Sequence, residues 1–271
     1  MSDALGFGPG SAFAAARSAI LGAADELFCE VIRTMSIRII CHMISSVDGR
    51  LLPDRWSRPG ARADISEVYE MAASSFAADG WIVGRATMAE YAACVHQGEP
   101  AALRGGSEPA PEPFAGDRGG RPLAVFVDPK GRLLSDEATL PTGEHLVAVL
   151  SPRVAESHLA KLRSAGVSYV FEGPEGRELE GALAQIERVF GVRTLLLEGG
   201  IINGAFVKAG LVNALSVLVY PAVDGLAGVP SIVGLPGAPG DRPAERMHLT
   251  LAGCRVLAGG IVWLTYSARN D

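Results

Sequence analysis

The stretch LLLEGGIINGAFVKAG, residues 195–210, contains the pattern on which the fold of this chain depends. Its three leucines read as the end of a buried strand, and Glu198 follows at the carboxyl end of that strand. Gly199 and Gly200 leave backbone N–H groups uncovered, and residues 202–209 have the spacing of a short helix. Such a junction offers the free donors and the positive helix end that a dinucleotide pyrophosphate needs. A tight turn that binds nothing explains the same residues equally well.

The composition indicates a globular protein with a sizeable core. Of the 271 residues, 48% are hydrophobic and 20% are charged. The formal net charge of −6 argues against nucleic acid as a partner, and no apolar run approaches the roughly 20 residues that a membrane span needs. The four cysteines lack a Cys-x-x-Cys motif and the five histidines lack metal-ligand spacing. We therefore expect reduced thiols, a cytoplasmic location and no metal site.

Residues 1–34 are expected to form a helical extension ahead of one domain that spans residues 35–271. Residues 11–33 are alanine-rich with apolar residues at helical spacing, which predicts an amphipathic helix. Acidic residues within this segment argue against a transit peptide. Two interpretations stay open, namely a simple upstream extension and a helix that packs on a partner subunit.

Two further strand ends carry polar residues that suit a ligand. Residues 37–44 form a nearly continuous apolar run, which predicts a strand buried on both faces, and it leads into SSVDGR at residues 45–50. Residues 81–83 predict a second buried strand, followed by GRAT at a helix start. There the guanidinium of Arg85 and the hydroxyl of Thr87 suit phosphate. The simpler alternatives are a plain turn at the first strand end and a capped helix with a surface arginine at the second.

Strands alternate with helices through most of the chain. Further strands are expected at residues 123–127, 146–150, 167–171, 215–220, 247–256 and 260–266, and helices at residues 64–76, 154–164 and 178–190. A long loop rich in glycine and proline, residues 93–121, is interpreted as an insertion. The last two strands are joined too tightly for a crossover and should be antiparallel. The pattern predicts an α/β fold with three α/β/α layers and a mostly parallel sheet, antiparallel at its C-terminal edge.

Common nucleotide motifs and one hydrolase motif are missing from the sequence. No Gly-x-Gly-x-x-Gly follows a strand, and neither Gly-x-x-x-x-Gly-Lys-Ser/Thr nor Gly-x-Ser-x-Gly occurs, so a Rossmann module, a P-loop and a nucleophile elbow are unsupported. The chain contains instead five segments in a set order. These are SVDGR (46–50), GRAT (84–87), SPR (151–153), EGG (198–200) and GAFVKAGLV (204–212).

In that order the segments resemble the dihydrofolate-reductase-like superfamily, and within it the reductase domain of bacterial riboflavin biosynthesis, the C-terminal half of the bifunctional deaminase–reductase. The resemblance covers about residues 35–266. It implies a dihydrofolate-reductase-like mixed sheet, NADPH as hydride donor, a small-molecule substrate and a homodimer. The deaminase half is not matched, since the sequence has no His-x-Glu…Pro-Cys-x-x-Cys.

The resemblance also assigns residues to the cofactor and the substrate. The expected cofactor contacts are Ile44, Ser46 and Gly49 beside the nicotinamide, Arg85 and Thr87 at the phosphates, Ser151 and Arg153 near the adenosine 2′-phosphate, and Gly199, Gly200, Ile201, Ile202 and Asn203 around the pyrophosphate. Asp48 and Glu198, or water held by either, are the expected proton sources. Arginine and hydroxyl donors suit a 2′-phosphate better than the acidic residue that an NAD ribose prefers, so NADPH rather than NADH is expected.

The substrate side departs from the family. Riboflavin reductases usually carry a substrate-binding arginine on the helix before the second strand, whereas residues 71–76 here read MAASSF. Either Arg55, Arg58 or Arg62 grips a substrate phosphate instead, or the substrate is not a ribosyl phosphate.

We therefore expect an NADPH-dependent reductase of a C=O or C=N bond in a pyrimidine- or pterin-like heterocycle, with 5-amino-6-(5-phosphoribosylamino)uracil as the leading specific substrate. The alternative is a non-catalytic nucleotide-binding or dimeric interaction protein on the same fold.

Overall fold

The computed structural model describes residues 37–58, 63–92, 94–104, 111–173 and 178–271. The chain divides into two compact units, residues 1–36 and 37–271, and only the second is described below. The amphipathic helix expected at residues 11–33 lies outside the described residues.

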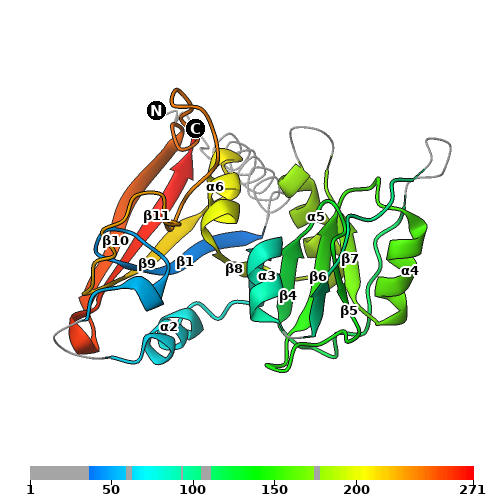
Figure 1. The fold of residues 1–271 in the computed structure, drawn as a ribbon, viewed down its shortest axis with the longest axis horizontal. Helices are drawn as coiled ribbons and strands as arrows, with labels where there is room; N and C mark the ends of the chain where they lie inside the picture. Colours follow the sequence, from blue (N-terminus) through cyan, green and yellow to red (C-terminus); the bar gives the residue numbers. More distant parts are fainter. Residues whose placement is uncertain (1–36, 59–62, 93, 105–110, 174–177) are drawn as a thin grey trace, which may run out of the picture. The chain divides into compact units, whose positions relative to one another are not determined.

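In the described part of the chain, nine strands form one sheet in the order β10-β11-β9-β1-β8-β2-β4-β6-β7 (Figure 1). The strands are β1 (Arg38–Ser46), β2 (Gly80–Gly84), β4 (Leu123–Val127), β6 (His145–Leu150), β7 (Ser168–Phe171), β8 (Thr194–Glu198), β9 (Ala214–Tyr220), β10 (Met247–Val256) and β11 (Val262–Asn270). All pairs from β9 to β7 are parallel, and β11 pairs antiparallel with both β9 and β10. The predicted mostly parallel sheet with an antiparallel C-terminal edge is confirmed.

Helices cover both faces of this sheet. On one face lie α2 (Ile65–Ser74), α3 (Arg85–Tyr91) and α4 (Glu156–Ser164), and on the other lie α5 (Glu178–Phe190) and α6 (Gly200–Lys208) (Figure 1). Because helices cover both faces, β4 and β6 are buried along their whole length, which explains the apolar sequence LAVFV of β4 and the apolar run LVAVL of β6. The predicted three-layer organisation is confirmed.

The helix starts follow local sequence signals. The carboxylate of Asp64 accepts hydrogen bonds from the backbone N–H groups of Ser66 and Glu67 and caps α2. At α6 the capping residue is Gly199, whose φ of 109° is a conformation that favours glycine. None of the helices in the described ranges is long and apolar enough to span a membrane.

The segment at residues 93–121 is not simply a loop. It contains the short strand β3 (Val95–Gln97), which pairs antiparallel with β5 (Leu133–Ser135), and Phe114 forms an isolated bridge with Tyr169. Neither short strand was predicted, because three residues are too few to show an alternating pattern. The segment is therefore anchored at both ends to the unit built around the sheet.

Candidate active site

The site lies at the point in the sheet where successive connections start to lead to opposite sides. Strands β2 and β8 are parallel neighbours, with Val83 opposite Glu198 at their carboxyl ends. From β2 the chain runs through α3 to β4 on one side, and from β8 it runs through α6 to β9 on the other (Figure 1). In open α/β sheets such a switch point forms a crevice at the carboxyl edge, where ligands bind.

The two helix starts at this crevice touch each other. A methyl group added to Gly199 would lie 3.2 Å from the hydroxyl oxygen of Thr87, and one added to Gly84 would lie 3.7 Å from the Cβ of Ile202. The first helical bond of α6 runs from the N–H of Asn203 to the carbonyl of Gly199, at 2.9 Å. The N–H groups of the three residues before Asn203 therefore point out of the helix end, at the carboxyl edge of the sheet. The structure thus brings Thr87 and Gly199 together, and Gly200 follows Gly199 in the chain.

The loop between β9 and β10 contacts α6 through residues 231–232. A methyl group on Gly200 would meet the carbonyl oxygen of Ser231 at 2.4 Å, and the side-chain amide of Asn203 donates to the carbonyl of Ile232 at 2.7 Å. Asn203 is fully buried, so its side chain supports this loop from behind rather than facing a ligand. Of the other expected pyrophosphate contacts, Ile202 is buried whereas Ile201 is 67% exposed at the helix end.

A cationic cavity of about 370 Å³ adjoins the start of α3. Arg85, Lys130 and Arg132 line it together with residues 127–129. The carboxylate of Asp128 accepts from the N–H groups of Arg132 (2.6 Å) and Leu133 (2.7 Å), so it is occupied within its own turn. Three cations at the carboxyl ends of two strands suit a phosphate group.

The expected 2′-phosphate residues lie next to this cavity. The N–H of Ser151 donates to the carbonyl of Pro129 at 3.2 Å, and the Ser151 hydroxyl accepts from the N–H of the exposed Arg153 at 3.3 Å. Lys130 and Arg132 were not predicted. The available signal was the sequence DPKGR directly after a buried strand, which places two cations at its carboxyl end.

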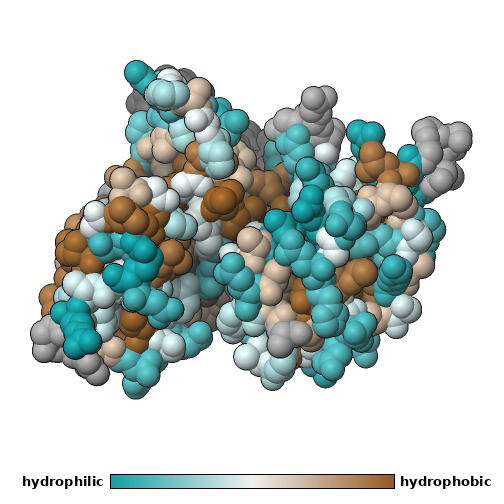
Figure 2. Space-filling view, viewed as in Figure 1, coloured by the Kyte–Doolittle hydropathy of each residue, from teal (hydrophilic) through white to brown (hydrophobic). Residues whose placement is uncertain are grey.

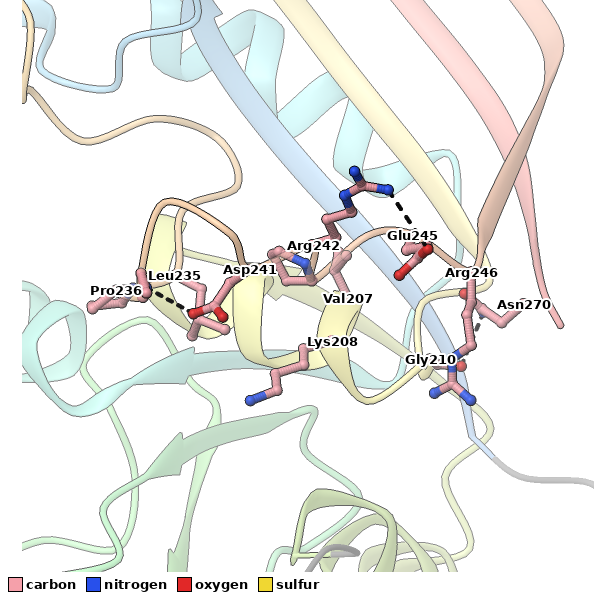
Figure 3. Close-up of a pocket in the computed structure, with 13 residues that line it drawn as sticks. Val207, Lys208, Gly210, Leu235, Pro236, Asp241, Arg242, Glu245, Arg246 and Asn270 are labelled. Atoms are coloured by element: carbon pink, nitrogen blue, oxygen red, sulfur yellow. Dashed lines mark hydrogen bonds and ion pairs between the residues drawn. The ribbon is translucent and has the colours of Figure 1, made fainter.

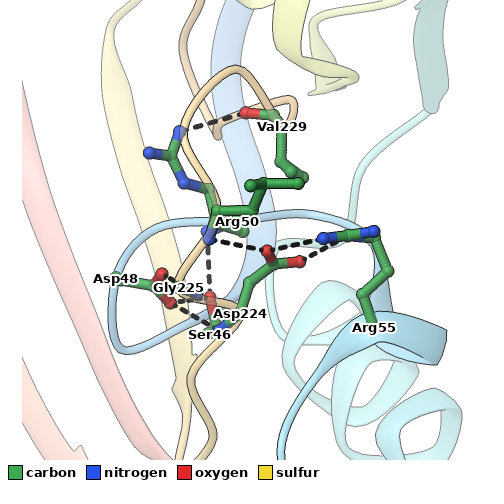
Figure 4. A network of polar contacts seen from close by, with 8 residues as sticks. Ser46, Asp48, Arg50, Arg55, Asp224, Gly225 and Val229 are labelled. Carbon is green, nitrogen blue, oxygen red and sulfur yellow. Dashed lines mark hydrogen bonds and ion pairs between the residues drawn. The ribbon is translucent and has the colours of Figure 1, made fainter.

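The loop after β1 is braced by Asp48 (Figure 4). Its carboxylate accepts from the Ser46 hydroxyl (2.6 Å) and from the N–H groups of Asp224 (3.0 Å) and Gly225 (2.8 Å). These donors hold the pKa of Asp48 well below its usual range. Gly49 turns the chain with φ of 76° and donates its N–H to the carbonyl of Ser46. A carboxylate that stays ionised and fully engaged is poorly suited to be the proton source expected at this position.

Two arginines join this loop to residues 222–231 (Figure 4). Arg55 binds Asp224 through two nitrogens, at 2.9 and 3.2 Å, and Arg50 donates to the carbonyl of Val229 at 3.0 Å. Of the three candidates for a phosphate clamp, Arg55 is thus already paired, Arg58 is exposed, and Arg62 lies outside the described residues.

The carboxyl group of Glu198 has a different environment from that of Asp48, and its pKa shifts in the opposite direction. Leu196 packs against the α2 side of the sheet, so Glu198, two residues further along β8, projects from the same face and is half-buried. Burial raises the pKa of Glu198, a hydrogen bond with Tyr69 lowers it, and the charge of Glu70 raises it, which together give a pKa of about 7. Ile44 lies on the same face of β1, among residues packed under α2. Glu198 therefore exchanges a proton near neutral pH beside an apolar wall.

A second cavity of about 370 Å³ lies at the opposite end of α6 (Figure 3). Lys208, Arg242 and Arg246 line it, but so do Asp241 and Glu245, and Arg242 approaches Glu245 to 3.9 Å. The mixed charge favours no single class of ligand. Because the cavity adjoins the C-terminal end of α6 rather than Gly200, it is separate from the crevice.

The profile of the RibD C-terminal domain family matches residues 38–263 of this chain. A search of curated proteins gives no match. Among solved structures, similarity is found to a pyrimidine reductase-like protein of Corynebacterium diphtheriae, with 16% identity, a TM-score of 0.59 and coverage of 87% of this chain and 92% of the other.

Two longer proteins share the fold. They are RibD of Acinetobacter baumannii (17% identity, TM-score 0.57, coverage of 89% of this chain and 60% of the other) and a diaminohydroxyphosphoribosylaminopyrimidine deaminase/5-amino-6-(5-phosphoribosylamino)uracil reductase of Thermotoga maritima (12%, 0.52, 91% and 60%). This chain thus spans about 60% of the length of each. At these identities the similarity establishes the fold.

Proposed function

Because the chain belongs to the RibD C-terminal domain family and is therefore a reductase of that type, we propose that it reduces a C=O or C=N bond in a pyrimidine-like heterocycle with NADPH as hydride donor. The observation that carries the proposal is the crevice between β2 and β8. Two helices begin there side by side, and a half-buried carboxyl group with a pKa near neutrality lies at the same edge.

NADPH fits the cofactor half of this crevice. The outward-pointing N–H groups at the start of α6 and the hydroxyl of Thr87 provide donors for a pyrophosphate. The cavity lined by Arg85, Lys130 and Arg132 provides charge for a 2′-phosphate, with Ser151 beside it. A ribose without that phosphate would leave the three cations uncompensated, which favours NADPH over NADH.

The residues of this chain contribute chiefly by orientation and by holding a proton. NADPH, when bound, supplies the hydride. Gly199 and Gly200 allow the close backbone approach that sets the position of the cofactor, and Ile44 provides an apolar wall beside the acceptor carbon. Glu198, protonated below about pH 7, donates the proton that accompanies hydride addition.

For the substrate we propose 5-amino-6-(5-phosphoribosylamino)uracil or a close relative without the phosphate. The Thermotoga maritima protein that shares the fold is described as a reductase of this compound. Arg55, which could have bound the phosphate, is paired with Asp224. This pairing favours a substrate whose heterocycle, rather than its phosphate, supplies most of the recognition.

We further propose that the protein acts as a homodimer. Leu249 and Leu251 on β10 stand opposite Ala268 and Tyr266, and they are 46% and 55% exposed. Val256 is 75% exposed, and Figure 2 shows hydrophobic residues gathered over this end of the sheet. An exposed apolar edge strand is a natural surface for a second copy. Leu251→Lys should convert the dimer to a monomer in light scattering. The expected cytoplasmic location stays a prediction.

The purified full chain tests the main proposal. We expect NADPH to bind more tightly than NADH in calorimetry, and NADPH to be oxidised when 5-amino-6-(5-phosphoribosylamino)uracil or its dephosphorylated form is added. Failure to bind either nicotinamide cofactor would refute the proposal. Binding without turnover on pyrimidine, pterin and small carbonyl substrates would instead support a non-catalytic nucleotide-binding protein.

A further inference from the structure

We propose that Tyr69 is a positioning residue of the reductase, because its hydroxyl group, held at the point where β1 and β8 separate, fixes the carboxyl group of Glu198 and the proton that it carries. This inference rests on the proposed function and extends it to a residue on α2 that does not belong to any of the sequence motifs.

The strand register places Tyr69 beside Glu198. The ladder between β1 and β8 ends at the pair Cys41–Leu197, whereas β1 continues along β9 to the pair Ser46–Tyr220. The Tyr69 hydroxyl donates to the carbonyl of His42, at 2.9 Å, one residue beyond the last β1–β8 pair. Glu198 is likewise the next residue of β8, on the face that α2 covers, so its carboxyl group lies beside the Tyr69 hydroxyl, which lowers its pKa.

A tyrosine hydroxyl carries a single hydrogen, and here it has two acceptors. When Glu198 is protonated, Tyr69 can keep its bond to His42 and accept the carboxyl hydrogen. When Glu198 is ionised, the Tyr69 hydrogen can turn to its carboxylate, and the carbonyl of His42 then loses this donor. The orientation of the Tyr69 hydroxyl is therefore coupled to the proton on Glu198.

Tyr69 is itself held by a buried hydrogen-bond network whose protonation does not change near neutral pH. His42 Nε2 lies 3.3 Å from the Tyr69 carbonyl, which can only accept, so Nε2 carries the hydrogen. His42 Nδ1 then accepts from the Ser216 hydroxyl at 2.9 Å, and Ser216 accepts from the indole of Trp263 at 2.8 Å. Burial lowers the pKa of His42 to about 4, so its ring stays neutral at physiological pH. The rings of His42 and Tyr69 also pack, with centroids 4.3 Å apart.

The other groups coupled electrostatically to Glu198 come from three elements: Glu70 raises the pKa of Glu198, whereas Glu198 raises the pKa of Tyr91 and of Cys41. Glu70 lies on α2, Tyr91 on α3 and Cys41 on β1, and the pKa of Cys41 is raised to about 12 by its burial and then by Glu198. None of these three groups carries positive charge. The hydrogen bond from Tyr69 thus provides the stabilisation that the ionised form of Glu198 receives from α2.

Tyr69→Phe tests the proposal, and Tyr169→Phe is the matched control. Tyr169 also has a buried hydrogen-bonded hydroxyl, but it lies on β7, at the far edge of the sheet. The titration of Glu198 is followed by NMR in protein labelled with ¹³C at the glutamate carboxyl carbon, and the Glu198→Gln variant assigns the signal. We expect Tyr69→Phe to shift this titration to higher pH by about one unit, since it removes a donor to the charged form, and Tyr169→Phe to leave it unchanged.

Turnover provides the second measurement. In Tyr69→Phe the alkaline limb of the pH profile should move by the same amount, and kcat should fall while the KM for NADPH stays constant. If Tyr69→Phe does not fold, Tyr69→Leu, which also lacks the hydroxyl, should give the same shift. An unchanged Glu198 titration in the folded variant would overturn the proposal. A shifted titration in a protein that never oxidises NADPH would refute the reductase role and retain the coupling of the two side chains.

Discussion

The proposed cofactor half and the proposed substrate half of the site differ in the groups that form them. The cofactor half consists of the backbone N–H groups of residues 200–202 and of cations that directly follow strand ends. The substrate half consists of side chains such as Glu198 and Tyr69, which are held by a buried network beneath α2. We therefore expect substitutions in the first half to change cofactor affinity and substitutions in the second half to change turnover.

The largest effect on kcat is expected when the carboxyl proton of Glu198 is removed. Glu198→Gln should lower kcat by roughly 100- to 10,000-fold, the usual contribution of a general acid, with the Kd for NADPH unchanged. Steady-state kinetics and calorimetry measure the two quantities. Glu187→Gln on α5 is the control. A loss of NADPH affinity that matches the loss of kcat would mean that the two halves are not separate.

The same substitution should stabilise the fold above neutral pH. In the unfolded chain Glu198 ionises near its ordinary pKa of 4.5, whereas in the folded protein it stays protonated up to about pH 7. Below pH 4 Glu198 therefore does not lower the free energy of unfolding. Between pH 4 and 7 it lowers this free energy progressively, and above pH 7 the loss stays constant. Glu198→Gln should raise the free energy of unfolding by up to about 3 kcal/mol at pH 8 and hardly at all at pH 4. Urea denaturation at both pH values measures this, and equal effects at both would contradict the assigned pKa.

On the cofactor side we expect a change of selectivity. The double variant Lys130→Ala/Arg132→Ala should weaken NADPH binding about tenfold or more, the worth of a hydrogen bond to a charged group, and leave NADH binding unchanged. Arg85→Ala, which removes the third cation of the same cavity, should likewise weaken the binding of NADPH more than that of NADH. Calorimetry with both cofactors measures the effects. Equal losses for NADPH and NADH in the double variant would place the 2′-phosphate elsewhere.

The smallest effect is expected at Arg55. Both of its bonded nitrogens contact Asp224, so Arg55→Met should leave the KM of phosphorylated and dephosphorylated substrates in the same ratio as in the wild type. Asp224→Asn, which weakens the pairing, is the companion variant. A selective rise of KM for the phosphorylated substrate in Arg55→Met would identify this residue as the missing phosphate clamp.

The contrast between the two halves also explains what could be predicted from the sequence. The layers, the sheet type and the junctions at Arg85 and Gly199 follow from local signals, because strand ends, glycines and helix starts are consecutive in the chain. Tyr69 and His42 form one network only through strand register and helix packing, which one-dimensional spacing does not contain. Asp48 shows the same limit, since its hydrogen-bond donors at residues 224–225 come from a distant loop.

The central position of β1 has a consequence for synthesis of the chain. Strands β2, β4, β6 and β7 pair with one another in the order in which they are made, whereas β1 pairs only with β8 and β9, which begin at Thr194 and Ala214. On the ribosome, β1 is therefore an apolar strand with both edges open until most of the chain has emerged. Nascent chains that stop before residue 194 should accordingly associate with chaperones or aggregate, because their first strand has no neighbour.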